Sequence, residues 1–225
     1  MSKFLLPMRY SIAEENYIKA IWRLQQHQSP VSTNDLAGVL QTRAASVTDM
    51  LKRLHEKKIL HHEPYHGATL SNEGKKIALL IIRRHRLWEF FLAEKLQFSW
   101  DQVHAIAEEL EHVSSKELID RLDAYLNFPK ADPHGDPIPD RSGKIDATKR
   151  KSLHSLPLNT KATVSGVTDQ STAILELLQH KKIAIGTKVE IIQRFVFDGS
   201  FEIRINEKTT TQITAQLAQN ILVTI

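Results

Sequence analysis

The chain has no cysteine, few glycines and no long apolar segment. Without cysteine, disulfide bonds, thiolate zinc sites, iron–sulfur clusters and thiol catalysis are all excluded. The eight glycines are not clustered, so there is no phosphate-binding glycine loop, and the common zinc-protease and serine-hydrolase motifs do not occur. The longest apolar run, residues 77–82, is far shorter than the roughly 18 residues of a membrane span. Any metal site must therefore use imidazole, carboxylate, amide or carbonyl ligands.

Composition and charge indicate a globular protein with an uneven charge distribution. The 225 residues are 41% hydrophobic and 25% charged, enough for one or two packed cores. Residues 1–86 carry 14 Lys and Arg against 7 Asp and Glu, residues 87–147 carry 6 against 13, and residues 148–225 carry 10 against 6. This order suggests a polyanion-binding part followed by a cation-binding part. The N-terminal residues lack a signal-peptide core, which predicts a cytoplasmic protein without membrane association.

A turn-forming stretch divides the chain. Residues 127–140 hold four of the eight prolines, and no helix or central strand can run through them. The pattern before this stretch is helical. After about Lys161, apolar and polar residues alternate around a hairpin turn at Asp198 and Gly199, which predicts a small β-barrel with one helix at 171–180 and a last strand at 221–225.

These patterns predict a mainly α protein with four parts. The parts are an N-terminal domain at 1–72, a helical domain at 73–140, a linker at 141–160 and the β-barrel domain at 161–225. Helices are expected over about residues 71–95, 99–112 and 114–126 of the middle region. Their apolar stripes are wide enough to serve a dimer interface as well as a core.

The first part has the pattern of a winged helix-turn-helix. Ser11 and Glu14 form a capping box before a helical apolar stripe, a second helix begins at the cap Ser32, and a third follows closely. Residues 59–63 and 68–70 predict two short strands joined by a loop. Three helices followed by a two-stranded wing are typical of this DNA-binding module.

The third helix offers a surface for double-stranded DNA. Its outward side chains are short or charged, as close approach to the major groove requires. They are Arg43, Ala44, Ala45, Ser46, Thr48, Asp49, Lys52 and Arg53. The alternative is a solvated helix face on a metal-independent winged helix that binds proteins.

Four metal-competent side chains share one face of the helix expected at 99–112. They are His104, Glu108, Glu111 and His112. They fall within about a 100° arc, but the two histidines are about 12 Å apart along the axis, which predicts two neighbouring sites. His85 and Glu89, one turn apart on the preceding helix, are natural partners for one end.

Ligands of nitrogen and oxygen suit Mn(II), Fe(II), Co(II) or Zn(II), and the carboxylates favour Mn(II). The alternative is that these groups are solvated ion pairs on exposed helices. The remaining histidines show no such spacing and are interpreted as loop or surface residues. Among them are His61, His62, His66, His134, His154 and His180.

Several segments together resemble the family of metal-dependent repressors that includes the diphtheria toxin repressor and the manganese transport regulator. They are residues 15–21 (ENYIKAI), 47–51 (VTDML), 84–87 (RHRL) with Glu89, then Glu108, 111–113 (EHV) and 133–139 (PHGDPIP). The resemblance covers nearly the whole chain. It implies a homodimer with an N-terminal winged helix, a helical metal-binding and dimerisation domain, and a C-terminal SH3-like domain related to the iron-transport accessory (FeoA) module.

The resemblance also implies two metal sites and a preference for one metal ion. The residues that match a primary site are Asn16, Glu108, Glu111 and His112. Those that match an ancillary site are His85, Glu89 and His104, with Gln170 from the C-terminal domain. Glu108 stands where iron sensors have a soft cysteine, which favours manganese, whereas Asn16 replaces the Asp of manganese sensors or the Met of iron sensors. Val167 lies where an acidic ancillary ligand is expected.

We therefore expect a Mn(II)-responsive transcriptional regulator that represses metal-uptake genes and is not an enzyme. Glu108 and Glu111 are like charges on adjacent turns, so the metal-free site is expected to repel itself until a divalent ion binds. Binding would then tie the first helix to the helical domain and fix two recognition helices about 34 Å apart on operator DNA. The alternatives are an Fe(II)-responsive regulator of the same family and a dinuclear metalloenzyme.

Overall fold

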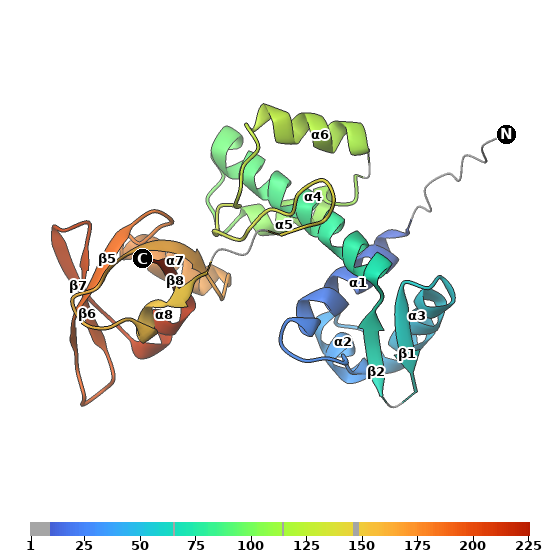
Figure 1. The fold of residues 1–225 in the computed structure, drawn as a ribbon, viewed down its shortest axis with the longest axis horizontal. Coiled ribbons are helices and arrows are strands. Elements are labelled where there is room, and N and C mark those ends of the chain that lie inside the picture. Colours follow the sequence, from blue (N-terminus) through green and yellow to red (C-terminus); the bar gives the residue numbers. More distant parts are fainter. Residues whose placement is uncertain (1–9, 65, 114, 146–148) are drawn as a thin grey trace. The chain divides into compact units, whose positions relative to one another are not determined.

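The computed structural model describes residues 10–64, 66–113, 115–145 and 149–225, which form two compact units (Figure 1). Unit 1 contains Met1–His85, Glu111–Ser114 and Pro139–Lys144. Unit 2 contains Arg86–Leu110, Ser115–Ile138 and Ile145–Ile225. Within the described ranges, no helix is both long and apolar enough to span a bilayer.

Unit 1 is built on the predicted winged helix-turn-helix. Its elements are α1 (Ile12–Gln25), α2 (Thr33–Val39), α3 (Ala44–Glu56) and the antiparallel strands β1 (Leu60–Glu63) and β2 (Gly67–Leu70). The capping box is present, because the Ser11 hydroxyl accepts from the Glu14 amide at 3.2 Å and the Glu14 carboxylate accepts from the Ser11 amide at 3.0 Å. Ser32 caps α2 by accepting from the amide of Asp35 at 3.1 Å.

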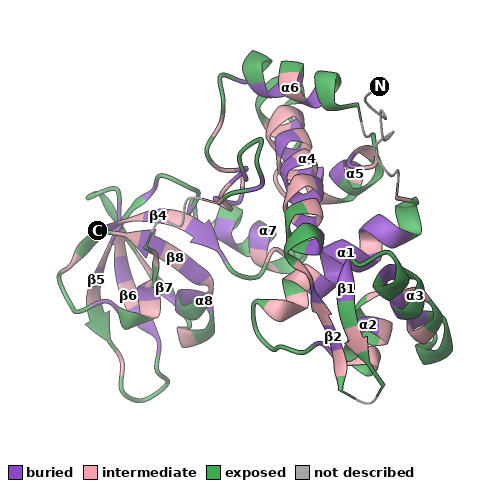
Figure 2. Cartoon of the chain, turned by 45° about the vertical axis from the view of Figure 1, so that its right-hand side comes forward, coloured by how far each residue is buried: buried purple, intermediate pink, exposed green. Residues whose placement is uncertain are grey.

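The core of unit 1 joins the first helix to the third. Ile18 and Ile21 of α1 and Val47 and Leu51 of α3 belong to one buried cluster and are each 0% exposed. Figure 2 shows the buried residues of α1, which contacts α2, α3 and strand β2 of the wing. Because interiors are close-packed, a shift of α1 is transmitted to α3.

Helix α4 (Asn72–Leu96) passes from unit 1 into unit 2, where α5 (Val103–Leu110) and α6 (Lys116–Tyr125) follow. The helix expected to reach His112 ends at Leu110. The backbone carbonyl of Glu111 accepts instead from the Arg84 guanidinium at 2.5 Å, a side-chain contact of the kind that ends helices. Ser114, the expected start of the next helix, lies outside the described residues, and Ser115 caps α6.

The C-terminal part of unit 2 is a six-stranded sheet in the order β3-β8-β4-β5-β6-β7. Its elements are β3 (Lys151–Ser152), the short 3-10 helix η1 (Leu153–Ser155), β4 (Lys161–Val167), α7 (Thr172–His180), β5 (Lys188–Arg194), β6 (Phe201–Ile205), β7 (Thr209–Ile213), α8 (Ala215–Asn220) and β8 (Ile221–Thr224). With this sheet and the wing, the fold is mixed α and β, so the prediction of a mainly α protein was only partly right. β3 and η1 fall inside the segment predicted as a linker, and Leu153 belongs to the core of the sheet domain.

Candidate metal centre and nucleic-acid interface

The first candidate metal centre lies in unit 1 around Glu111, and we call it the Glu111 cluster. Its members are Glu15, Lys19, Arg84, His85, Glu111 and His112. Glu111 is 0% exposed, with Oε2 2.7 Å from His85 Nδ1. Its other oxygen, Oε1, is 2.5 Å from Lys19 Nζ and 3.8 Å from His112 Nε2.

Glu15 brings helix α1 into this cluster. Its Oε1 is 2.7 Å from Arg84 Nη2, and its Oε2 is 2.7 Å from His112 Nδ1. Glu15 and Lys19 are one turn apart on α1 and therefore lie on the same face. Asn16, the predicted ligand on α1, is the neighbour of Glu15 and is partly exposed. The structure thus brings together Glu111, His112 and His85 of the predicted set, and adds Glu15.

Fixed cations neutralise the carboxylates of the Glu111 cluster. Burial raises the pKa of Glu111, but the hydrogen bond from His85 and the charge of Lys19 outweigh it and hold the pKa below its ordinary value. Arg84 pairs with Glu15 in the same way. The expectation that this metal-free site repels itself is therefore wrong for the Glu111 carboxylate, because sequence spacing did not include Lys19 and Arg84.

The second candidate centre lies in unit 2, and we call it the His134 cluster. It consists of Glu89 on α4 with Asp132 and His134 on the proline-rich loop. One ligand atom from each of the three lies within 4.8 Å of the others, and all three residues are buried. His134 lies in a loop as expected, but the interpretation of it as a surface residue was wrong, because its side chain is 0% exposed.

The orientation of the His134 ring leaves one nitrogen free for a cation. Nε2 lies 2.7 Å from the carbonyl oxygen of Trp100, which only accepts, so Nε2 carries a hydrogen. Nδ1 lies 3.9 Å from Glu89 Oε1 and 4.0 Å from Asp132 Oδ1. It is buried and has no hydrogen-bond partner among the described residues. A histidine that donates one N–H to a backbone carbonyl and directs its other nitrogen at carboxylates has the arrangement found at metal sites.

The carboxylates of the His134 cluster are poorly compensated. Burial raises the pKa of Asp132 well above its ordinary value, and the neighbouring charges of Glu89 and Asp136 raise it further, while Arg86 opposes them. Asp132 is held in place because its Oδ1 accepts from the amides of His134 and Asp136, both at 2.9 Å. A divalent cation fits this group of donors, because it removes the repulsion among them.

The remaining predicted ligands of unit 2 lie at the edge of this cluster. His104 Nδ1 is 3.1 Å from Glu89 Oε1, and His104 Nε2 is 3.6 Å from Glu108 Oε1. The Glu108 side chain is 49% exposed, the most exposed of the acidic candidates. Gln170 donates through Nε2 to Asp136 Oδ2 at 3.3 Å, so its amide nitrogen contacts the loop that carries His134.

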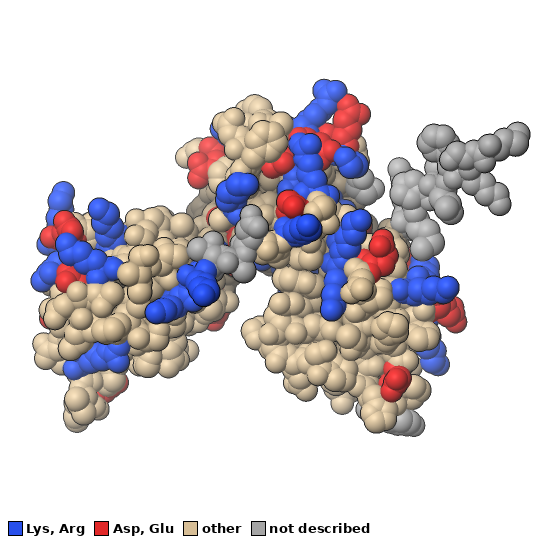
Figure 3. All heavy atoms as spheres, in the orientation of Figure 1, with Lys and Arg blue, Asp and Glu red and all other residues tan. Residues whose placement is uncertain are grey.

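Most of the candidate DNA-binding side chains are exposed. Ala45, Ser46, Asp49, Lys52 and Arg53 of α3 and its N-cap residue Arg43 are exposed, and Thr48 is partly exposed with its hydroxyl donating to the Ala44 carbonyl at 3.0 Å. A groove of about 780 Å³ lies between α2, α3 and the wing. It is lined by polar side chains that include Ser32, Asn34, Thr48, Lys52, His62 and His66. On the face drawn in Figure 3, basic and acidic side chains are interspersed. The uneven charge distribution along the sequence therefore does not produce a single large basic or acidic patch on this face.

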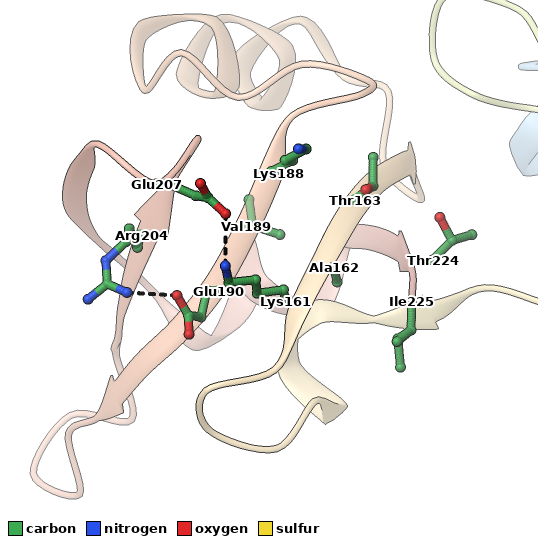
Figure 4. A pocket seen from close by; sticks show the side chains of 10 residues that line it. All are labelled: Lys161, Ala162, Thr163, Lys188, Val189, Glu190, Arg204, Glu207, Thr224 and Ile225. Atoms are coloured by element: carbon green, nitrogen blue, oxygen red, sulfur yellow. Dashed lines mark hydrogen bonds and ion pairs between the residues drawn. The ribbon is translucent and has the colours of Figure 1, made fainter.

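A separate pocket of about 260 Å³ lies in the C-terminal sheet domain between β4, β5 and β8 (Figure 4). Its charged residues pair with one another, Lys161 with Glu207 at 2.8 Å and Arg204 with Glu190 at 2.7 Å. The first pair is largely exposed, the second is partly buried, and the lining provides no imidazole. The pocket therefore lacks the chemistry of the two clusters.

Comparison with known proteins agrees with these features. Residues 11–68 match the N-terminal DNA-binding domain of the iron-dependent repressors, residues 71–140 match their metal binding and dimerisation domain, and residues 151–225 match the FeoA domain. The transcriptional regulator MntR of Oceanobacillus iheyensis is 32% identical over 118 residues, which cover 52% of this chain and 80% of that protein. The chain belongs to the iron-dependent repressor family. Members of this family are metal-dependent, DNA-binding transcriptional repressors rather than enzymes.

Two further comparisons show how far the family likeness extends. IdeR of Mycobacterium leprae is 30% identical over 125 residues, 56% of this chain and 54% of that protein. The solved structure of a manganese-dependent transcriptional repressor in complex with manganese has a TM-score of 0.82 and 33% identity, and the match covers 93% of this chain and 98% of that one. The family fold therefore covers the winged helix, the helical domain and the C-terminal sheet domain together.

Six residues of the two clusters and their ion pairs were not singled out as site residues from the sequence. They are Glu15, Lys19, Arg84, Arg86, Asp132 and His134. The only signal was the family resemblance, since Glu15 and Lys19 lie in 15–21, Arg84 and Arg86 in 84–87, and His134 in 133–139, which Asp132 directly precedes. Residue type and spacing gave no further signal, because charged residues in helices are usually solvated.

Proposed function

We propose that this chain is a Mn(II)-responsive repressor of metal-uptake genes that binds operator DNA in the cytoplasm as a homodimer. The observation that carries the metal-dependent part is the His134 ring, whose buried Nδ1 is directed at two buried carboxylates. Burial and the neighbouring carboxylates disfavour the charged form of Asp132, and a divalent cation bound here would offset this cost. The domain composition of the family supports the DNA-binding part.

The metal ligands we propose fall into two groups. In the His134 cluster they are Glu89, Asp132 and His134, with His104 at the edge. In the Glu111 cluster they are Glu15, His85, Glu111 and His112, with Asn16 as a further candidate. A bound divalent cation supplies the positive charge that the carboxylates require. Glu108, which contacts His104, and Gln170, which contacts Asp136, are further proposed ligands.

Mn(II) is favoured by the donor atoms. Every candidate ligand offers oxygen or imidazole nitrogen, and carboxylates are at least as numerous as imidazoles, which suits a cation that accepts hard oxygen ligands. The likeness to a structure described as manganese-dependent supports the same choice. Fe(II) is the second candidate, supported by the relatives named as iron-dependent repressors. Co(II) and Zn(II) suit the same ligands.

The coupling to DNA is proposed to run through α1. Glu15 on α1 contacts His112 and Arg84 at one end, while Ile18 and Ile21 on the same helix share a core with α3. Ordering of the Glu111 cluster would therefore restrict the position of the recognition helix. Coupling of this kind is typically worth about 1 to 3 kcal/mol, or roughly 5- to 150-fold in affinity.

The homodimer is supported by apolar side chains that remain exposed in the helical domain. Tyr125 is 63% exposed, Phe128 53% and Leu118 40%. A dimer would place two copies of α3 on one face of DNA, about 34 Å apart or a multiple of this distance. The expected target is therefore a palindromic operator.

Calorimetric titration of the metal-free full-length chain with Mn(II) tests the metal part. His134→Ala and Glu111→Gln are each expected to remove or weaken one set of sites by about 10-fold or more. The control is His180→Ala, because His180 is an exposed imidazole on α7 away from both clusters. Unchanged uptake in both cluster variants, or loss in the control, would contradict the assignment.

A further inference from the structure

Lys19 is a buried cation inside a cluster of metal-competent side chains. It lies on α1 one turn after Glu15, and its side chain is 7% exposed. Its Nζ atom is 2.5 Å from Oε1 of Glu111, which is itself 0% exposed. Lysine is almost never buried unless it is paired, so this position indicates a specific role.

The oxygen that Lys19 contacts is also the one that faces a histidine. Glu111 Oε1 lies 3.8 Å from His112 Nε2, and a metal ion shared by these two atoms would lie within a few ångströms of Lys19 Nζ. Two positive charges at that separation in a buried site repel strongly. The ammonium group and a divalent cation therefore compete for the same carboxylate oxygen.

The two clusters differ in their fixed positive charge. In the Glu111 cluster, Lys19 faces Glu111 and Arg84 faces Glu15, so each carboxylate already has a cation. In the His134 cluster, Arg86 is 3.5 Å from Asp132. This contact is longer than the 2.5 Å between Lys19 Nζ and Glu111 Oε1.

We propose that Lys19 is a resident counter-cation that determines how the Glu111 cluster takes up metal. In the metal-free chain it holds Glu111 to α1, and when metal is available it limits this cluster to at most one divalent ion, bound more weakly than in the His134 cluster. This inference rests on the proposed metal-dependent function. It assigns to Lys19 a specificity-determining role, not that of a ligand.

Replacement of Lys19 by methionine separates this role from a structural one. Lys19→Met keeps the length and bulk of the side chain and removes the charge, which leaves Glu111 uncompensated in the metal-free protein. The thermal midpoint of the metal-free chain is then expected to fall, while the affinity of the Glu111 cluster for Mn(II) rises by about 10-fold or more. If Lys19 were merely structural, its replacement would lower both the thermal midpoint and the Mn(II) affinity, or lower the midpoint and leave the affinity unchanged. Lys19→Gln is the second variant in case methionine impairs folding.

Two controls isolate charge and location. Lys19→Arg keeps the positive charge and is expected to leave Mn(II) affinity within about threefold of the natural chain. Lys57→Met removes a lysine that lies outside the Glu111 cluster and pairs at 2.5 Å with Glu14, which is on α1 like Lys19. The Lys57 side chain is 37% exposed. It is expected to lower stability slightly without changing metal affinity.

The experiment is titration of Mn(II) into each full-length variant by calorimetry, with the Asp132→Asn change added to all of them so that the Glu111 cluster dominates the signal. Tighter uptake in Lys19→Met or Lys19→Gln, with a lower metal-free midpoint, supports the inference. If the Lys19 variants bind Mn(II) with equal or lower affinity than the chain that keeps Lys19, the inference about Lys19 is overturned and the proposed function stays intact. If the unmodified chain and every Lys19 variant bind no Mn(II), the proposed function and the inference both fail.

Discussion

A Cβ atom placed on Gly135 would lie 2.2 Å from the carbonyl oxygen of Ser165. Gly135 follows His134 in the proline-rich loop, and Ser165 lies in β4 of the C-terminal sheet domain. Here the two backbones are in direct contact, and the amide of Val167 also donates to the His134 carbonyl at 3.3 Å. The position of His134 is therefore fixed by packing against the C-terminal domain as well as by its own loop.

Gly135→Ala is expected to lower the stability of the chain and weaken Mn(II) binding by the His134 cluster. Gly135 has φ +87°, where an alanine costs about 1 to 2 kcal/mol, and the clash with Ser165 adds to this strain. The matched control is Gly186→Ala, because Gly186 has φ +86° but no atom within 4 Å of the added Cβ. Thermal unfolding of both variants gives the comparison, and equal midpoints would show that the contact with β4 is unimportant.

Asp132→Asn is expected to stabilise the metal-free protein at neutral pH. The folded chain raises the pKa of Asp132 from its ordinary value of 3.8, so the folded state binds this proton more tightly than the unfolded state does. Stability is consequently lost as the pH rises from about 3.8 through the raised pKa. Asparagine carries no charge, and its Oδ1 still accepts from the amides of His134 and Asp136.

The test of this pH dependence is unfolding of both chains between pH 4 and pH 8. The advantage of Asp132→Asn should be small near pH 4 and grow toward pH 8, with a midpoint gain of a few degrees. Asp123→Asn, which alters a buried aspartate of α6, is the control. A constant difference across the range would mean that Asp132 does not titrate as its surroundings imply.

Lys52→Ala is expected to weaken DNA binding at all sequences by a similar factor. Lys52 is exposed on α3 and lines the groove beside the wing, where it can contact a phosphate. Loss of one phosphate contact reduces the slope of log affinity against log salt by about 0.9. The control is Lys208→Ala, in the turn between β6 and β7, which should leave the slope unchanged. If both variants give the same slope, Lys52 does not contact DNA.

The winged helix could be predicted because its signals are local. The capping box at Ser11 and Glu14, the cap at Ser32 and the apolar spacing of α3 each depend on residues within one or two turns. The hairpin turn at Asp198 and Gly199 is local in the same sense, and the structure confirms it. The family resemblance added the order of the domains.

The candidate site could be predicted only where ligands share a helix face. His134 escaped notice because its burial comes from Glu89, 45 positions earlier, and from the carbonyl of Trp100. Glu15 and Lys19 have the spacing of a solvated ion pair on a helix, yet both are buried and contact different partners. Long-range packing of this kind has no counterpart in local spacing, so the charges that neutralise the Glu111 cluster could not be counted from the sequence.

The coupling between metal and DNA is the central claim, and a binding titration tests it most directly. Duplex DNA selected in vitro by the Mn(II)-loaded chain would be titrated by fluorescence anisotropy with metal-free and Mn(II)-loaded protein, for the unmodified chain and for His134→Ala and Glu111→Gln. We predict that Mn(II) tightens binding of the unmodified chain by roughly 5- to 150-fold and has little effect on the two variants. Equal affinity with and without Mn(II) in the unmodified chain would contradict the account.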